Sequence, residues 1–151
     1  MKIINYFEQT NETQNILKEQ LPLSEWRAAH YLHDVLNKNT FMEKYGRSAK
    51  LFMLVDDSKL MAFCTLAERD EIEAEDLSPW IGFVYTYPAF RGHRYSEQLI
   101  NFACDAAKRD GCKQVFISSE ELGLYEKYGF EFIAYMKTIW GEDTQVFSRE
   151  L

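Results

Sequence analysis

The sequence has few of the residues that staple or break a fold: three cysteines, three prolines and seven glycines among 151 residues. An odd cysteine count with no Cys-x-x-Cys pair indicates neither a disulfide framework nor a cysteine-rich zinc site. The glycines and prolines are scattered, so no linker, repeat or low-complexity tract is visible. We therefore expect a single domain over residues 1–151, with reduced thiols as in a cytoplasmic protein.

Long apolar runs and an excess of positive charge are also missing. The longest uncharged stretch, residues 77–90, has 14 residues and two prolines, which is too short to cross a bilayer. The start of the chain, MKIINYFEQT, lacks the apolar segment of a secretory leader. The formal net charge of −7 disfavours binding to a polyanion. We therefore expect neither a membrane nor a nucleic-acid partner.

Aromatic residues, in contrast, are abundant, because 11 Phe, 9 Tyr and 3 Trp make up 15% of the chain. Such residues favour β-strands and suit a pocket that holds an extended ligand. The hydrophobic patterning predicts elements in the order β α α β β β α β α β β. Strands are predicted at 2–7, 51–55, 60–66, 80–87, 115–117, 130–140 and 144–148, and helices at 11–20, after a cap at Ser24, at 92–110 and at 120–128, with a shorter helical segment at 40–45.

Residues 80–118 form the most informative part of this pattern, a strand, a loop, a helix and a second strand. Two parallel strands joined by a helix need a right-handed crossover. The helix then begins at the carboxyl end of the first strand, where α/β sheets bind ligands. The first N–H groups of that helix have no internal partner and, with the helix dipole, can bind a pyrophosphate.

The loop before this helix has the composition of an anion site. Arg91 and Arg94 add positive charge to an acidic chain, and the small residues Gly92 and Ser96 let a phosphate approach the backbone. The alternative is an ordinary strand–helix turn whose arginines are solvated. A second motif, GLYEKYGF at 123–130, predicts a short helix ended by glycine, in which Tyr125 is either functional or core filler.

Together the two motifs resemble the Gcn5-related N-acetyltransferase (GNAT) family. Its members carry an Arg/Gln-x-x-Gly-x-Gly/Ala loop after their fourth strand, here RGHRYS at 91–96, and a late LYEKxGF-like element, here LYEKYGF at 124–130. The resemblance covers nearly the whole chain and is strongest over 80–132. Arg94 stands at a position where the family usually has glycine, and Ser96 where it has glycine or alanine. Arg94 could still donate its N–H from a helical conformation and could pair with a phosphate directly.

The resemblance implies a mixed α/β acyl-CoA N-acyltransferase fold, with a mostly antiparallel sheet of about seven strands flanked by about four helices. It also implies that acetyl-CoA, as the acetyl donor, binds between the fourth and fifth strands. The residues implied to bind it are Val84, Tyr85 and Thr86 on the strand and Arg91, Gly92, His93, Arg94, Tyr95 and Ser96 in the loop. Ser118 stands where many members have an asparagine.

The resemblance further implies direct transfer to an amine, without an acyl-enzyme or a metal. A backbone N–H of the fourth strand would stabilise the tetrahedral oxyanion. Tyr125 would face the thioester sulfur and donate a proton to the departing thiolate. Two alternatives belong to other classes: a degenerate acyl-CoA-binding or regulatory module without turnover, and a protein-modifying N-acetyltransferase. The chain is expected to be a monomer or a homodimer.

The acceptor is expected to be a small cationic amine. Residues 68–76 carry six acidic side chains and one arginine, a net charge of −5. This stretch is either a solvated connection or an electrostatic attractor for a cation. The candidate general bases are Glu68, Asp70 and Glu71, and Trp80 either lines the acceptor pocket or packs in the core.

Two histidines, His30 and His33, lie on the second predicted helix. His30 and His33 have a spacing that can suit a metal, but no further ligand is evident, so surface or pocket-rim positions are favoured. His33 is a further candidate base beside the acceptor.

Overall fold

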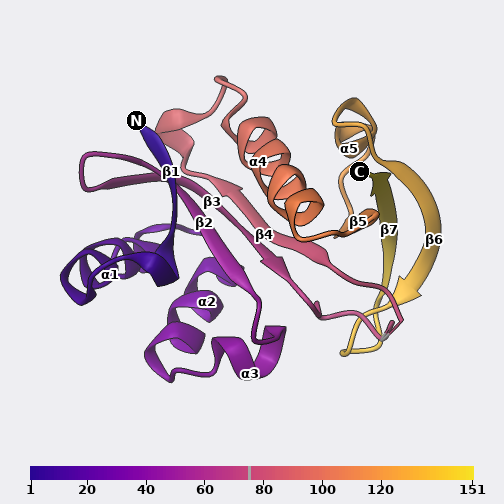
Figure 1. Ribbon diagram of the computed structural model, residues 1–151, viewed down its shortest axis with the longest axis horizontal. Helices are drawn as coiled ribbons and strands as arrows, with labels where there is room; N and C mark the ends of the chain where they lie inside the picture. The colour runs from indigo at the N-terminus through magenta and orange to yellow at the C-terminus, as the bar shows by residue number, and fades with distance from the viewer. Residues whose placement is uncertain (75) are drawn as a thin grey trace.

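The computed structural model describes residues 1–74 and 76–151 and is built around a seven-stranded sheet (Figure 1). The strand order is β1-β2-β3-β4-β5-β7-β6, and every neighbouring pair is antiparallel except β4–β5. The strands are β1 (Lys2–Asn5), β2 (Lys50–Asp56), β3 (Lys59–Ala67), β4 (Trp80–Thr86), β5 (Gln114–Ser119), β6 (Glu131–Lys137) and β7 (Asp143–Glu150). The predicted mixed, mostly antiparallel sheet is confirmed.

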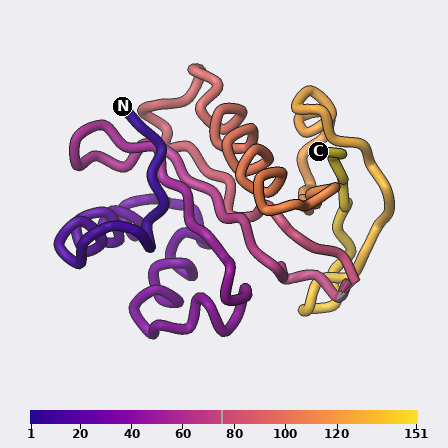
Figure 2. Tube along the Cα trace, viewed as in Figure 1, coloured from indigo at the N-terminus to yellow at the C-terminus, as the bar shows by residue number. Residues whose placement is uncertain are grey.

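Helices cover both faces of this sheet. The helices are α1 (Asn11–Lys18), α2 (Arg27–Asn37), α3 (Phe41–Tyr45), α4 (Tyr95–Arg109) and α5 (Leu124–Lys127), and the short 3-10 turns lie at Tyr6–Glu8, Leu21–Leu23 and Pro88–Phe90. The described chain thus has five α-helices rather than the expected four or so. Figure 1 shows α1, α2 and α3 on one side of the sheet and α4 on the other. Figure 2 shows that the first and last parts of the chain lie at opposite ends of the sheet.

The described residues form a large hydrophobic core on each face of the sheet, and a smaller cluster lies around Trp80 and Phe116. Beneath α4, residues such as Leu99 and Ala103 pack on Ile81 and Ile117 of the two parallel strands. On the opposite face, Leu32 of α2 belongs to the core that includes the β2 and β3 side chains. Cys64 and Cys104 are buried beneath α4, as their positions in a strand and on the inner side of a helix indicate. Among the described residues, no helix combines the length and apolar character needed to span a membrane.

Several predicted element boundaries are wrong. The first strand stops at Asn5, where a 3-10 turn follows. Ser24 does not cap α2 directly: its hydroxyl accepts the N–H of Trp26 at 2.9 Å, and Trp26 is the residue that precedes the helix. The helix predicted over 120–128 is confined to Leu124–Lys127, because Gly123 has a positive φ of 77° and starts the helix there.

The start of α4 also differs from the prediction, and the reason lies in the backbone. The helix begins at Tyr95 instead of residue 92. Gly92 has a φ of 91° and Arg94 a φ of 60°, so the loop turns twice through left-handed conformations before the helix forms. Arg94 therefore occupies a conformation that favours glycine, and the helical conformation considered for it is not adopted. Its side chain is 85% exposed, and its only ion-pair contact among the described residues is a 3.7 Å contact with Glu97.

Arg94→Gly should therefore stabilise the fold. Glycine removes the left-handed strain of about 1 kcal/mol, although its greater freedom in the unfolded chain offsets part of that gain. We expect the free energy of unfolding in urea to rise by roughly 0.5 kcal/mol. Lys38→Gly is the matched control, because Lys38 is also an exposed cation with one ion-pair contact but has an ordinary φ of −85°, so glycine there should lower stability. Equal losses of stability in both variants would contradict strain at Arg94.

Candidate active site

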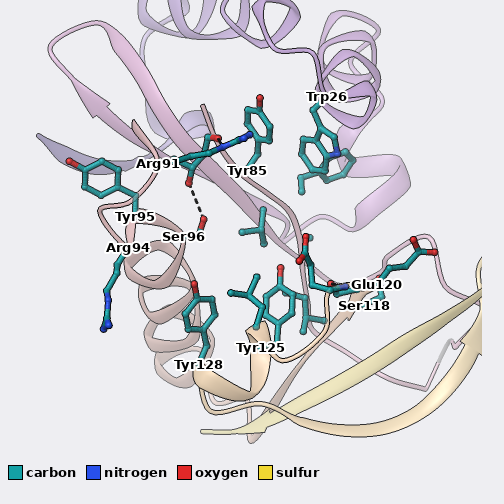
Figure 3. Close-up of a pocket in the computed structure, with 18 of the residues that line it drawn as sticks. Trp26, Tyr85, Arg91, Arg94, Tyr95, Ser96, Ser118, Glu120, Tyr125 and Tyr128 are labelled. Carbon is teal, nitrogen blue, oxygen red and sulfur yellow. Dashed lines mark hydrogen bonds between the residues drawn. The ribbon is translucent and has the colours of Figure 1, made fainter. Parts of the chain in front are cut away.

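The central opening of the molecule arises where β4 and β5 separate. The two strands pair only at Trp80 with Phe116 and at Ile81 with Ile117, and beyond these pairs they diverge. A cleft of about 1260 Å³ opens between the separated strands and continues past the start of α4 (Figure 3). Because the sheet is split here, the cleft is bounded by backbone from both strands, which supplies polar groups that pair with nothing in the sheet.

Nine of the ten site residues expected from the sequence line this cleft. They are Val84, Tyr85, Thr86, Arg91, Gly92, Arg94, Tyr95, Ser96 and Tyr125. His93 does not: it is exposed on the loop and its ring stacks on Tyr95, with the ring centroids 5.3 Å apart. The structure thus brings together two motifs that lie about 30 residues apart in the chain.

The β4 wall of the cleft carries a bulge. The β3–β4 register skips between Phe63 and Thr65, so that Phe83 and Val84 together face Cys64. Phe83 has a positive φ of 48°, which is unusual for an aromatic residue and re-aims the backbone of the strand. The bulge lies in the part of β4 that has separated from β5, and both of its residues line the cleft.

The loop between β4 and α4 is fixed by contacts back to the end of β4. The Arg91 Nε donates to the Thr86 carbonyl at 2.9 Å, and the Arg91 guanidinium lies 5.5 Å from the centre of the Tyr85 ring. The Ser96 and Thr86 hydroxyls are 2.9 Å apart and hydrogen-bonded. These contacts aim the first turn of α4 at the cleft, where its N–H groups and the helix dipole favour an anion.

Tyr125 is the buried polar residue of the opposite wall. Its side chain is only 6% exposed and its ring packs against those of Tyr128, Phe130 and Phe147, while Figure 3 shows its hydroxyl directed into the cleft. Burial raises the pKa of the Tyr125 phenol above its ordinary value, and the negative charge of Glu121 adds to the rise. The phenol is thus protonated throughout the physiological range and can act as a donor.

Several cleft residues were not found from the sequence. Trp26, just before α2, stacks on Tyr85 with an interplanar angle of 6° and a ring separation of 5.1 Å. Phe83 completes an aromatic wall with them, and Glu120 and Glu121 line the cleft at the end of β5. No local pattern distinguishes Trp26 from a core residue, since its role depends on α2 packing across the sheet.

The other candidates lie outside the cleft lining. His30 contacts the Ser24 carbonyl at 2.7 Å, and His33 contacts Glu19 at 3.4 Å. Trp80 is fully buried against Phe116 and donates its indole N–H to a backbone carbonyl, which is a packing role.

The acidic stretch at 68–76 is partly internal rather than wholly solvated, although Glu75 lies outside the described residues. Glu68 accepts the N–H of Ser48 at 3.0 Å. Glu71 accepts the Tyr45 hydroxyl at 2.8 Å. Asp70 accepts the Ser118 hydroxyl at 3.4 Å. Three of the carboxylates therefore hold this segment against α3 and β5.

Comparison with known proteins places the chain in a family. The model of the acetyltransferase (GNAT) family matches residues 11–130. A comparison with curated protein sequences gives no significant match. Among solved structures, an acetyltransferase from Streptococcus agalactiae superposes with a TM-score of 0.70 at 17% identity, covering 99% of this chain and 98% of that chain.

Two further solved structures contain coenzyme A or acetyl-CoA. An aminoglycoside 6'-N-acetyltransferase complexed with coenzyme A gives a TM-score of 0.69 at 12% identity, covering 99% of this chain and 97% of that one. A GNAT family acetyltransferase from Elizabethkingia anophelis with acetyl-CoA bound gives 0.65 at 16% identity, again covering 99% and 97%. At such identities these structures share the fold, while the family model spans most of the sequence. The chain belongs to the GNAT family of acetyltransferases.

Proposed function

We propose that the protein transfers the acetyl group of acetyl-CoA directly to an amine of a small cationic molecule. The observation that carries this proposal is the split between β4 and β5, which has the N-terminus of α4 beside it and the buried phenol of Tyr125 on its other wall. A donor whose pyrophosphate is separated from an uncharged thioester by an extended arm fits this distribution of groups. Membership in an acetyltransferase family supports the same reaction.

The cofactor would be held along the length of the cleft. Its pyrophosphate would accept hydrogen bonds from the backbone N–H groups in the first turn of α4, next to Gly92 and Ser96. Arg91 and Arg94 would supply positive charge there. Its pantetheine arm would pair with the free backbone edge of β4 in the manner of an added strand. The acetyl group would then lie beside the bulge at Phe83 and Val84.

The chemistry follows from that placement. The acceptor nitrogen attacks the acetyl carbon, and a backbone N–H at the bulge stabilises the oxyanion that forms. The carbon–sulfur bond then breaks, and Tyr125 donates its proton to the thiolate. Because burial raises the pKa of this phenol, it does not ionise within the pH range of the reaction. No acyl-enzyme is required, so both substrates must be bound together.

The acceptor class is inferred from the other end of the cleft. The rings of Trp26, Phe83 and Tyr85 form a wall to which an ammonium group is attracted by the ring quadrupoles. Glu120 and Glu121 add negative charge nearby. A compact alkylammonium compound suits such a mixed aromatic and acidic surface better than an anion or a neutral amide.

The function can be tested by mixing the purified protein with acetyl-CoA and a panel of polyamines, aminoglycosides and lysine peptides, and measuring release of the CoA thiol. We expect turnover with at least one small polyamine or aminoglycoside and intersecting, sequential initial-rate patterns. Turnover with peptides alone would reassign the chain to protein modification. Affinity for acetyl-CoA with no thiol release from any acceptor would favour a binding module.

Ser96→Glu should abolish the cofactor site. A carboxylate at this position would lie in the first turn of α4, beside the end of β4 that Ser96 contacts through Thr86, and would repel the pyrophosphate. We expect the Kd for acetyl-CoA in calorimetry to rise about 100-fold or more. Gln98→Glu, which adds the same charge on the exposed side of the same helix, is the control and should change the Kd less than about threefold. Unchanged affinity in Ser96→Glu would remove the pyrophosphate from this loop.

Tyr125→Phe tests the proton donor. The substitution keeps the ring contacts and removes the hydroxyl, so the protein should fold and bind acetyl-CoA normally. We expect kcat to fall roughly 10- to 1000-fold under conditions in which chemistry limits the rate. Tyr128→Phe removes a second hydroxyl from the same wall of the cleft and should leave kcat within about threefold. Full kcat in the folded Tyr125→Phe variant would leave Tyr125 as a packing residue.

A further inference from the structure

Asp70 lies where the two strands of the cleft separate. Its Oδ2 accepts the Ser118 hydroxyl at 3.4 Å, and its Oδ1 lies 3.5 Å from the point that a Cβ on Gly82 would occupy. Gly82 belongs to β4 and Ser118 to β5, and both line the cleft. The carboxylate therefore borders both strands, and the glycine leaves no side chain between it and β4.

The alternation of side chains along β5 shows on which face Asp70 lies. Ile117 packs in the core beneath α4 together with Tyr125, whereas Phe116 packs with Trp80 on the opposite face. Successive strand residues point to opposite faces, so Ser118 shares the face of Phe116. The carboxylate that Ser118 contacts is thus on the far side of the sheet from the phenol of Tyr125.

The surroundings of Asp70 are acidic and phenolic. Glu71 is its neighbour in the chain and accepts the Tyr45 hydroxyl at 2.8 Å, while Thr65 approaches Gly82 from β3. Asp70 takes part in no salt bridge among residues 1–74 and 76–151. Burial raises the pKa of the Asp70 carboxyl to about 6 and the charge of Glu71 adds to the rise, while the Glu71 N–H and the Ser118 hydroxyl oppose it.

We propose that Asp70 is the general base of this enzyme, taking a proton from the acceptor ammonium on the face of the sheet opposite Tyr125. The proposal rests on the proposed acetyl transfer. Asp70 lies behind Gly82 and Ser118 and is not itself part of the cleft lining. Two strand residues span about 7 Å, so a nitrogen approaching the bulge at Val84 would pass its proton to this carboxylate through a bridging water beside Gly82. The acceptor would then enter from the α2–α3 face and the thiolate would leave on the α4 face.

The proton balance closes with these two groups. Asp70 accepts one proton from the ammonium, and the freed electron pair forms the nitrogen–carbon bond. The carbon–sulfur bond then breaks with its electron pair on sulfur, which takes the proton of Tyr125. The second nitrogen proton, lost as the amide forms, restores the phenol, and Asp70 releases its proton to solvent. The net products are an amide, CoA thiol and one proton.

The test is the dependence of kcat on pH at saturating acetyl-CoA and amine. In the unaltered protein kcat should rise with an apparent pKa near 6, because only the carboxylate form of Asp70 accepts a proton. Asp70→Asn should lose this inflection and lower kcat at pH 7.5 by about 100-fold or more. Its remaining rate should increase about tenfold per pH unit, because free amine must then come from solution.

Two further variants shift the inflection without removing the base. Ser118→Ala removes a donor to the carboxylate, so the inflection should move to higher pH. Glu71→Gln removes a neighbouring negative charge, so the inflection should move to lower pH while the plateau value of kcat is retained. Asp76→Asn, which removes an exposed carboxylate of the same acidic stretch, is the control and should leave the pH of the inflection unchanged. These shifts remain measurable if Asp70→Asn does not fold.

The outcomes separate the base from the other roles of the acidic stretch. If Asp70→Asn keeps full kcat and the inflection near 6, Asp70 is not the base, although the acetyl transfer stands. If the unaltered protein itself shows no turnover with any amine, the proposed function fails first. If the rate of Asp70→Asn falls below that of the unaltered protein only at low salt and subsaturating amine, Asp70 attracts the substrate and does not accept its proton.

Discussion

The separation of β4 from β5 is the constraint on which the rest of the molecule depends. The two strands pair at Trp80 with Phe116 and at Ile81 with Ile117, and the crossover helix α4 packs on one face of this pair. Backbone groups that a continuous sheet would pair are left facing a cleft. The bulge at Phe83 and the paired hydroxyls of Thr86 and Ser96 then orient that free edge toward the start of α4.

The same split places different chemistry on the two faces of the sheet. The phenol of Tyr125 is surrounded by aromatic rings beneath α4, where burial keeps it protonated. Asp70 and the Tyr45–Glu71 pair lie on the other face, against α3. A reaction that takes a proton from one substrate and gives one to the other benefits from this separation, because an acid and a base in contact would exchange the proton between themselves.

The loop before α4 shows how the chain tolerates a departure from its family's pattern. Arg94 occupies a left-handed conformation where glycine is usual, and its exposed side chain contributes only a weak contact with Glu97. The contacts of Arg91 and Ser96 with Thr86 hold the loop in place. The loop therefore keeps its conformation despite the backbone strain at Arg94.

The sequence by itself indicated the mixed sheet through its apolar patterning and the family through the motifs RGHRYS and LYEKYGF, and nine of the residues that the resemblance implies line the cleft. It did not determine where α4 and α5 begin, since positive φ at Arg94 and Gly123 is decided by packing. Nor could it place Trp26 against Tyr85, or distinguish among the candidate bases Glu68, Asp70 and Glu71. Those choices depend on contacts between segments far apart in the chain, which form only when the sheet has folded and split.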